Sequence, residues 1–288
     1  WGPTDGGTNG AGWSNAIGLG WRTAGPFSAG MGGLASNTTY YYRCFASNAF
    51  GAAWAPASEI FMTAGGGVIY ANDDAAGSNN GMSWSNAFTD LRTALKVALS
   101  NEIWVAAGTY RAGTDPTNRM ATFRMKSWVN LYGGFDGTET DRGQRNWTNN
   151  VSVLDGDTLG DDAGFSNNVE NVYHVVSGTN NATLDGFTVR GGNANGTSPH
   201  DRGGGMYNSM ASFTVRNCVF ARNSASSRGG GLYDLSASVS LVERSVFASN
   251  RAAGTGMGGG MYSSGAGAHT IRGCQFTDNT ADRGAAIY

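Results

Sequence analysis

The chain has 288 residues, enough for one large or two ordinary domains, and its 40% hydrophobic and 11% aromatic content excludes a disordered chain. Glycine supplies 46 residues, well above the usual share of roughly 7%, but only 5 prolines and the absence of a Gly-X-Y period exclude a collagen. The formal net charge of −2, without a basic block, excludes a nucleic-acid-binding protein, and no apolar run approaches the roughly 18 residues of a membrane-spanning helix.

Residues 1–63 carry a pattern of their own. The run LASNTTYYYRC over 34–44 is followed by ASNAFG over 46–51 and by EIFMT over 59–63. This pattern resembles the second half of a fibronectin type III domain, in which Tyr40 would be the corner tyrosine. The resemblance implies a partial β-sandwich whose first strands would precede residue 1.

The segment 64–67 contains three consecutive glycines and is expected to be a short flexible linker. Residues 68–70 then predict a strand that opens a second domain, which we expect to extend over 68–288.

A helix is predicted over 88–100, with Asn86 or Thr89 as its N-cap. Further strands are predicted directly after it, over 102–110 and 128–132. Because the unpaired first edge of a stacked β-structure invites aggregation, we expect this helix to cover that edge. The apolar residues that define its buried face are Phe88, Leu91, Leu95, Ala98 and Leu99.

The final hundred residues repeat four times, in two lines that recur in step. The first line is a glycine-rich run that ends in a hydrophobic residue and a tyrosine, and its tyrosines are 26, 29 and 26 residues apart. The second line is Phe-x-x-Asn. The tyrosines are Tyr207, Tyr233, Tyr262 and Tyr288, and the second line consists of Phe220 with Asn223, Phe247 with Asn250 and Phe276 with Asn279.

Short alternating stretches rich in β-branched residues separate the two lines, which favours a solenoid of strands over one of helices. Stacked coils place equivalent residues about 4.8 Å apart, so we expect the phenylalanines to form an inward ladder. The asparagines would take the left-handed backbone conformation at the following bend and bond to one another along the stack. The glycines would let the chain turn where a Cβ would clash with the next coil.

The cysteines are predicted to remain unpaired. Cys218 and Cys274 share one position but lie two coils apart, about 9.6 Å, which exceeds the roughly 7 Å limit for a disulfide. Cys44 belongs to the other domain. We therefore expect three free, buried thiols.

The predicted helix and strands after residue 68, together with the two recurring lines, resemble a right-handed parallel β-helix of the pectin-lyase-like superfamily. The pairing of Phe-x-x-Asn with Gly-Gly-hydrophobic is similar to the polymorphic outer-membrane protein repeats of bacterial surface adhesins. The resemblance implies an all-β solenoid with an N-terminal capping helix, truncated at its C-terminal end because the last repeat stops at Tyr288.

Two candidate binding groups lie in the repeats. His200, Asp201 and Arg202 precede a glycine triplet and form either a binding set or a solvated loop, since adjacent side chains usually diverge. The tyrosine line forms either an outward ladder that stacks on sugar rings or a partner surface, or a part of the core. Its candidate residues are Tyr207, Tyr233 and Tyr262, with Asp234 beside them.

A third candidate is a calcium site. Asp155, Asp157 and Asp161 alternate along one loop and could surround the ion, although Ser166 stands where an EF-hand has its glutamate. A polar loop without calcium is the alternative. No carboxylate recurs directly after the inward phenylalanine line or the tyrosine line, so we expect the acidic residues to be scattered and name no catalytic residue.

These observations favour a non-enzymatic, secreted or cell-surface protein of bacterial type, whose solenoid is a rigid stalk or an adhesive face. The alternative is a carbohydrate-active β-helix that binds or cleaves an acidic polysaccharide. The expected partners are a carbohydrate or a cell surface, and no nucleic acid. End-to-end self-association is a further expectation, because the last coil has no predicted cap.

Overall fold

The computed structural model describes residues 1–35, 38–63, 67–99, 102–235 and 239–288. The chain divides into two compact units, Trp1–Gly67 and Val68–Tyr288, called unit 1 and unit 2 here, and each is described by itself. Residues 64–66 of the predicted linker lie outside the described residues. No helix among the described residues is long and apolar enough to cross a membrane.

Unit 1 contains a short 3-10 helix, η1 (Gly10–Gly12), and two antiparallel strand pairs. Strand β1 (Thr39–Tyr42) pairs with β4 (Glu59–Met62), and β2 (Phe45–Asn48) pairs with β3 (Gly51–Trp54). Tyr40 on β1 is buried and stacks on Phe61 of β4, with ring centroids 5.7 Å apart. Its hydroxyl accepts a hydrogen bond from the backbone N–H of Ala35 at 3.1 Å. The segments 46–51 and 59–63 thus contribute to two antiparallel pairs, the first to β2 and β3 and the second to β4.

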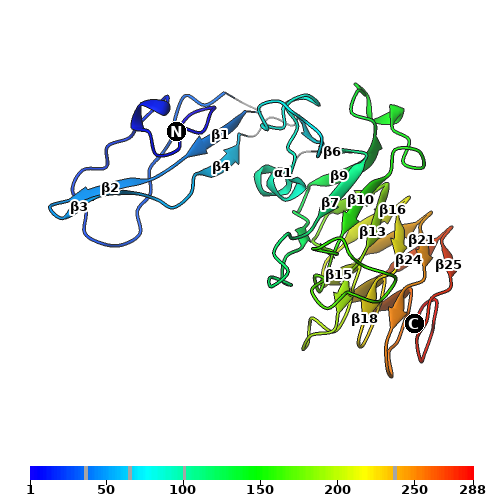
Figure 1. Ribbon diagram of the computed structural model, residues 1–288. Coiled ribbons are helices and arrows are strands. Elements are labelled where there is room, and N and C mark those ends of the chain that lie inside the picture. Colours follow the sequence, from blue (N-terminus) through cyan, green and yellow to red (C-terminus); the bar gives the residue numbers. More distant parts are fainter. Residues whose placement is uncertain (36–37, 64–66, 100–101, 236–238) are drawn as a thin grey trace. The chain divides into compact units, whose positions relative to one another are not determined.

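Unit 2 is built mostly from parallel strands (Figure 1). Its described residues form three long sheets and one short one. In each sheet the strands follow in chain order, and each stretch of chain from one sheet III strand to the next, between β6 and β24, adds one strand to each long sheet. Sheet I contains β7 (Gly108–Arg111), β10 (Ser152–Asp155), β13 (Phe187–Arg190), β17 (Val219–Ala221), β21 (Val246–Ala248) and β25 (Gln275–Thr277).

The other sheets have the same order. Sheet II contains β8 (Phe123–Arg124), β11 (Val176–Ser177), β15 (Met206–Ser209), β19 (Leu232–Leu235) and β23 (Met261–Ser264). Sheet III contains β5 (Val68–Ala71), β6 (Glu102–Ala106), β9 (Asn130–Phe135), β12 (Ala182–Asp185), β16 (Phe213–Arg216), β20 (Ser240–Glu243) and β24 (His269–Arg272). The short sheet contains β14 (Asn193–Ala194), β18 (Ser224–Ala225) and β22 (Arg251–Ala252).

The phenylalanines of sheet I lie in register between the sheets. Phe220 pairs with Phe247 and Phe247 with Phe276, and each pair of rings is stacked with centroids 4.9 Å apart. Phe220 and Phe247 are completely buried. This ladder therefore forms part of the core of unit 2.

The asparagines that follow form a second buried ladder. Asn250 donates through Nδ2 to the carbonyl of Phe220 at 2.8 Å and to Oδ1 of Asn279 at 3.0 Å. Its own Oδ1 accepts from the backbone N–H and from Nδ2 of Asn223, both at 3.1 Å. Because a carboxamide carries both donors and acceptors, the same residue can repeat along the stack with its side chain satisfied.

The predicted left-handed backbone at these asparagines is wrong by one residue. Positive φ angles of 55°, 54° and 55° belong to Arg222, Ser249 and Asp278, which directly precede the asparagines. The bend falls there because the asparagine side chain must point inward to reach its neighbour in the stack.

The glycine triplets allow close approach of successive repeats. Gly229 has φ +60°, and a Cβ on Gly231 would lie 2.5 Å from the carbonyl oxygen of Gly260 in the next repeat. Any larger residue at the third position of the triplet would force the strands apart.

The predicted helix is shorter than expected. Helix α1 spans Leu91–Val97 and begins at the N-cap Asp90, whose Oδ1 accepts from the backbone N–H of Arg92 at 2.9 Å. Phe88 is not helical, because its N–H donates to the carbonyl of Tyr70 and its own backbone extends the edge of sheet III beside β5. The helix contacts β5, β6 and β8, the first strands of sheets II and III.

The prediction of three buried thiols is wrong for two of them. Cys218 is buried, Cys274 is partly exposed and Cys44 is exposed, and all three are free. Burial raises the pKa of the Cys218 thiol to about 12. Cys274 is less covered because it belongs to the last described repeat, which packs against an earlier repeat on one side.

The asparagine ladder can be tested by mutation. Replacing Asn250 with alanine leaves the carbonyl of Phe220 and the N–H of Asn223 buried without their partners. Since each such group costs about 1–3 kcal/mol, we expect the free energy of unfolding, measured by urea denaturation, to fall by about 3 kcal/mol. The exposed Asn149→Ala should change it by less than about 0.5 kcal/mol. Equal midpoints for the two variants would contradict the role of the ladder.

Candidate functional site

An aromatic cluster covers the start of sheet III. Tyr70, Trp104 and Tyr132 occupy one row across β5, β6 and β9. Trp104 stacks on Phe135, with ring centroids 4.8 Å apart and planes 10° apart. The register between β6 and β9 shifts after Val105, and this bulge brings Phe135 beside Trp104.

The same bulge brings a loop onto the sheet. Gly134 has φ +97°, and a Cβ there would lie 2.7 Å from the backbone of Trp147. The backbone N–H of Asn146 donates to the carbonyl of Gly134 at 2.7 Å. A glycine at this position therefore lets the segment around Trp147 approach the sheet closely.

Two arginines project from this loop onto the aromatic rings. The 3-10 helix η2 (Arg142–Gln144) begins at Asp141, whose carboxylate and the Gln144 side chain form a capping box. This turn places the guanidinium of Arg142 at 4.6 Å from the ring centre of Tyr132. The guanidinium of Arg145 lies 5.0 Å from Tyr132 and 4.9 Å from the ring of Trp147.

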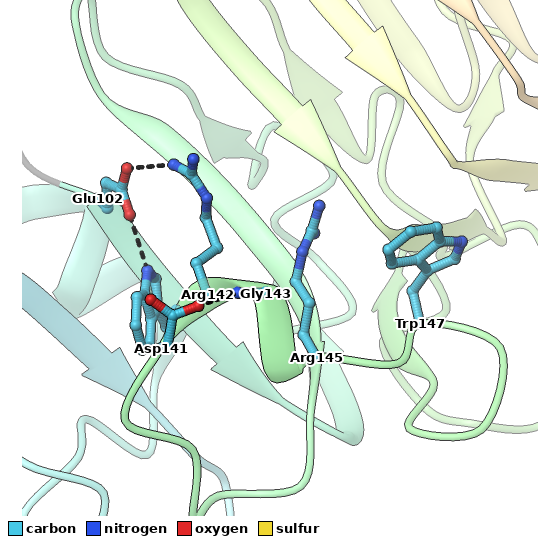
Figure 2. A pocket seen from close by; sticks show the side chains of 7 residues that line it. Glu102, Asp141, Arg142, Gly143, Arg145 and Trp147 are labelled. Carbon is cyan, nitrogen blue, oxygen red and sulfur yellow. Dashed lines mark hydrogen bonds and ion pairs between the residues drawn. The ribbon is translucent and has the colours of Figure 1, made fainter.

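Between these side chains lies an open groove of about 590 Å³, shown in Figure 2. Arg145 projects between Arg142 and Trp147, and Glu102 faces Arg142 from β6. We call this the Arg–Trp groove. Its lining consists of Glu102, Trp104, Asp141, Arg142, Gly143, Arg145 and Trp147.

Both carboxylates of the Arg–Trp groove are already engaged. Glu102 accepts from the indole Nε1 of Trp104 at 2.9 Å and forms an ion pair with Arg142. Asp141 accepts from the backbone N–H of Gly143 at 2.7 Å. The groove therefore offers ring faces and the half-exposed guanidinium of Arg142, while its acids are held in structural contacts.

The two arginines differ in how firmly they are fixed. Arg145 is nearly buried and pairs with the buried Asp185 at 2.8 Å. The side chain of Arg142 is 46% exposed, and its partner Glu102 is 33% exposed. Because exposed ion pairs are weak, an anionic ligand can compete with Glu102 for Arg142, while Arg145 stays in place.

A row of alternating charge continues from the groove across sheet III. Arg216 lies between Asp185 and Glu243, at 4.0 Å and 3.7 Å. Arg272 follows at 2.6 Å from Glu243 and, by hydrogen bonding to it, holds the pKa of that carboxyl below its usual range. The expectation of scattered acids is therefore wrong for this row. Its signal in the sequence is the last residue of β12, β16, β20 and β24, which alternates in sign.

The predicted tyrosine ladder is continuous. Successive rings of Tyr207, Tyr233, Tyr262 and Tyr288 are stacked with centroids 5.4, 5.3 and 5.7 Å apart. Tyr233 and Tyr262 are nevertheless buried. Arg202 lies over the Tyr233 ring at 5.6 Å, and Arg228 lies over Tyr262 at 5.2 Å. These rings therefore offer little free surface for a sugar.

In the predicted binding group of His200, Asp201 and Arg202, each side chain contacts another side chain of the protein. Asp201 pairs with Arg202 at 3.1 Å, and Nδ1 of His200 lies 3.0 Å from Nε2 of His174. His174 also stacks on Tyr207, at 4.9 Å between ring centres, so it joins this group to the tyrosine ladder. Sequence reasoning missed His174, although its position one residue after Tyr173 in a buried stretch was a usable signal.

Asp234, a predicted binding residue, is completely buried. Its carboxylate accepts from Asn208 and Ser240 and lies 2.8 Å from Nδ1 of His269. Ser240 and Ser263 also contact this same Nδ1, at 3.1 and 2.9 Å. In a nucleophilic triad the serine and the carboxylate contact opposite ring nitrogens. This group of serine, histidine and aspartate is therefore a structural network.

The three predicted calcium residues stay close together, and Oδ1 of Asp155 accepts from the backbone N–H of Asp157 at 3.1 Å, but their side chains have different partners. Asp155 pairs with Arg190 at 2.8 Å. Asp157 and Asp161 remain together, and Glu170 joins them, with one oxygen of each residue lying within 4.8 Å of the others. Glu170, which completes the group, lies four residues after Ser166. It therefore lies beyond the position where an EF-hand has its glutamate.

No protein-family model matches the chain, and no curated protein or solved structure is significantly similar to it. The function of this protein is therefore argued from the geometry of its side chains.

The buried histidine makes a testable contribution to stability. Burial lowers the pKa of His174 from 6.5 to about 4. Between these values the unfolded chain takes up a proton that the folded chain does not, so stability falls as the pH is lowered from 6.5 towards 4, by about 2 kcal/mol at pH 5.

His174→Gln removes this titration. We expect thermal unfolding of the variant to lose less stability between pH 7.5 and pH 5 than that of the wild type. Asp162, whose pKa is raised to about 6 by burial, has the opposite pH dependence, but it is present in both chains and cancels in the comparison. Parallel stability curves for the two proteins would contradict the prediction.

Proposed function

We propose that the chain belongs to a non-enzymatic, secreted or cell-surface protein that acts as a structural or adhesive module. In this proposal unit 2 is a right-handed parallel β-helix of the pectin-lyase-like type with repeats like those of polymorphic outer-membrane proteins. Parallel sheets whose strands follow in chain order, with ladders in register, support this proposal. Such an array is stiff because every repeat is bonded to the next through several sheets.

Unit 1 is proposed to be the second half of a fibronectin type III-like domain. Two features support this assignment. Strands β1 and β4 are antiparallel, and the buried Tyr40 bonds through its hydroxyl to the backbone of Ala35, five residues upstream. A tyrosine corner has this type of contact.

The Arg–Trp groove is proposed as the binding site, with a carbohydrate that carries carboxylate groups as its ligand. The single observation that carries this proposal is the placement of Arg142 and Arg145 beside the partly exposed ring of Trp147. An aromatic face stacks on a sugar ring, and a guanidinium binds a carboxylate through two parallel hydrogen bonds.

Cleavage of the carbohydrate is the less favoured function. Glycoside hydrolysis needs two carboxyl groups on either side of the bond, one of them free to donate a proton. In the groove Glu102 keeps its hydrogen bond from Trp104 when a ligand takes Arg142, and Asp141 caps η2. We therefore favour binding without turnover.

The groove can be tested by binding measurements on a panel of carboxylated and neutral oligosaccharides. We expect the full chain to bind carboxylated members, and Trp147→Ala or Arg142→Gln to weaken binding by about tenfold or more. The matched controls are Trp21→Ala, an exposed tryptophan of unit 1, and Arg244→Gln, an exposed arginine outside the groove. These should bind like the wild type.

Two outcomes would contradict the proposal. One is equal loss of binding in the groove variants and in the controls. The other is the release of shortened or unsaturated sugar products, which would identify the protein as an enzyme.

A further inference from the structure

The loop between β10 and β11 gathers four acidic residues. Asp157, Asp161 and Glu170 each place one oxygen within 4.8 Å of the others. Asp162 is next to them, and its backbone N–H donates to Oδ2 of Asp157 at 3.0 Å. We call these four residues the acidic loop group.

Asp157 and Asp162 of the acidic loop group line a hollow together with three arginines, Arg111, Arg190 and Arg222. Among the described residues none of its four carboxylates forms an ion pair, whereas the adjacent Asp155 is paired with Arg190. Arg111 approaches the loop, but it donates to the backbone carbonyl of Asp157 at 3.2 Å.

A buried amide lies beside the group. Asn171 is only 1% exposed, and its Oδ1 has no hydrogen-bond partner. Its Nδ2 donates to Oδ2 of Asp162 and to the carbonyl of Gly191, both at 2.7 Å. If the amide were flipped, its Oδ1 would face the Asp162 carboxylate and the Gly191 carbonyl, which are both acceptors. The orientation is therefore fixed, and Oδ1 is the atom left without a partner.

Two carboxylate oxygens of the group share this condition. Oε1 of Glu170 and Oδ1 of Asp162 are buried, and neither accepts a hydrogen bond in the described chain. Buried oxygens of this kind are rare unless a water or an ion satisfies them. Three such oxygens, on Asn171, Asp162 and Glu170, lack a partner in this part of the chain, and a bound cation would supply one.

We propose that Asp157, Asp161 and Glu170 bind one Ca²⁺ ion, with the buried oxygens of Asp162 and Asn171 beside the site. All donors are oxygens, which excludes the nitrogen and sulfur ligand sets typical of zinc. Ca²⁺ accepts six to eight oxygens at about 2.3–2.6 Å in an irregular arrangement, as a loop of this kind can supply, whereas Mg²⁺ requires a nearly ideal octahedron. The bound ion would tie residues 157–162 to residues 170–171.

The test is calorimetric titration of the metal-free full chain with CaCl₂, together with thermal unfolding in Ca²⁺ or in a chelator. We expect one ion per chain, with a dissociation constant of about 1 mM or lower, and a melting temperature that rises with Ca²⁺ concentration. Mg²⁺ at the same concentration should have little effect.

Asp161→Asn and Glu170→Gln should weaken Ca²⁺ binding by about tenfold or more. Asp161 is exposed, so its variant keeps the fold, which circular dichroism in chelator can verify. Asp278→Asn is the matched control: it removes one exposed carboxylate outside the loop and retains Ca²⁺ binding.

Two results would overturn the proposal. One is the absence of binding heat and of stabilisation up to about 10 mM Ca²⁺, well above the weakest affinities of extracellular calcium modules. The other is equal affinity in the wild type, Asp161→Asn and Glu170→Gln.

Discussion

Because the strands of unit 2 pair in parallel and in register, the nearest neighbour of most side chains is the side chain at the same position one repeat away. The spacing between strands is set by backbone hydrogen bonds at about 4.8 Å, so this neighbour is always in contact. A residue can therefore recur only if it packs well against itself. Phenylalanine, tyrosine and asparagine meet this condition, since rings stack and a carboxamide both donates and accepts.

Charged residues do not meet it, and the row on sheet III shows the alternative. Asp185, Arg216, Glu243 and Arg272 occupy one position in successive repeats and alternate in sign, so each has an opposite charge beside it. The same constraint explains the composition of the interior around Asp234. This buried carboxylate has no second carboxylate beside it and is contacted instead by asparagine, serine and histidine side chains. A row of stacked positions can thus repeat the same residue if that residue is neutral, whereas charged residues must alternate in sign along the row.

The recurrence of neutral residues and the alternation of charged ones determine which features could be predicted from the sequence. The Phe220 and Asn223 lines could be predicted because identical letters recur at a nearly constant spacing. The Arg–Trp groove could not, since Arg142, Arg145 and Trp147 lie in a loop that occurs once, and a bulge at Gly134 places them. Helix α1 was predicted too long because apolar periodicity does not reveal that Phe88 pairs with the sheet edge. Of the residues proposed to bind Ca²⁺, Asp157 and Asp161 were candidates from the sequence, whereas the pairing of Asp155 with Arg190 could not be foreseen because it joins strands 35 residues apart.

The alternating row has a consequence for the way such a chain can grow. Copying a single repeat and inserting it beside its original would set two acids or two arginines next to each other on sheet III. Copying two successive repeats together would preserve the alternation. In this part of the molecule the unit of duplication compatible with its electrostatics is therefore a pair of repeats, even though backbone geometry and the aromatic stacks would accept one.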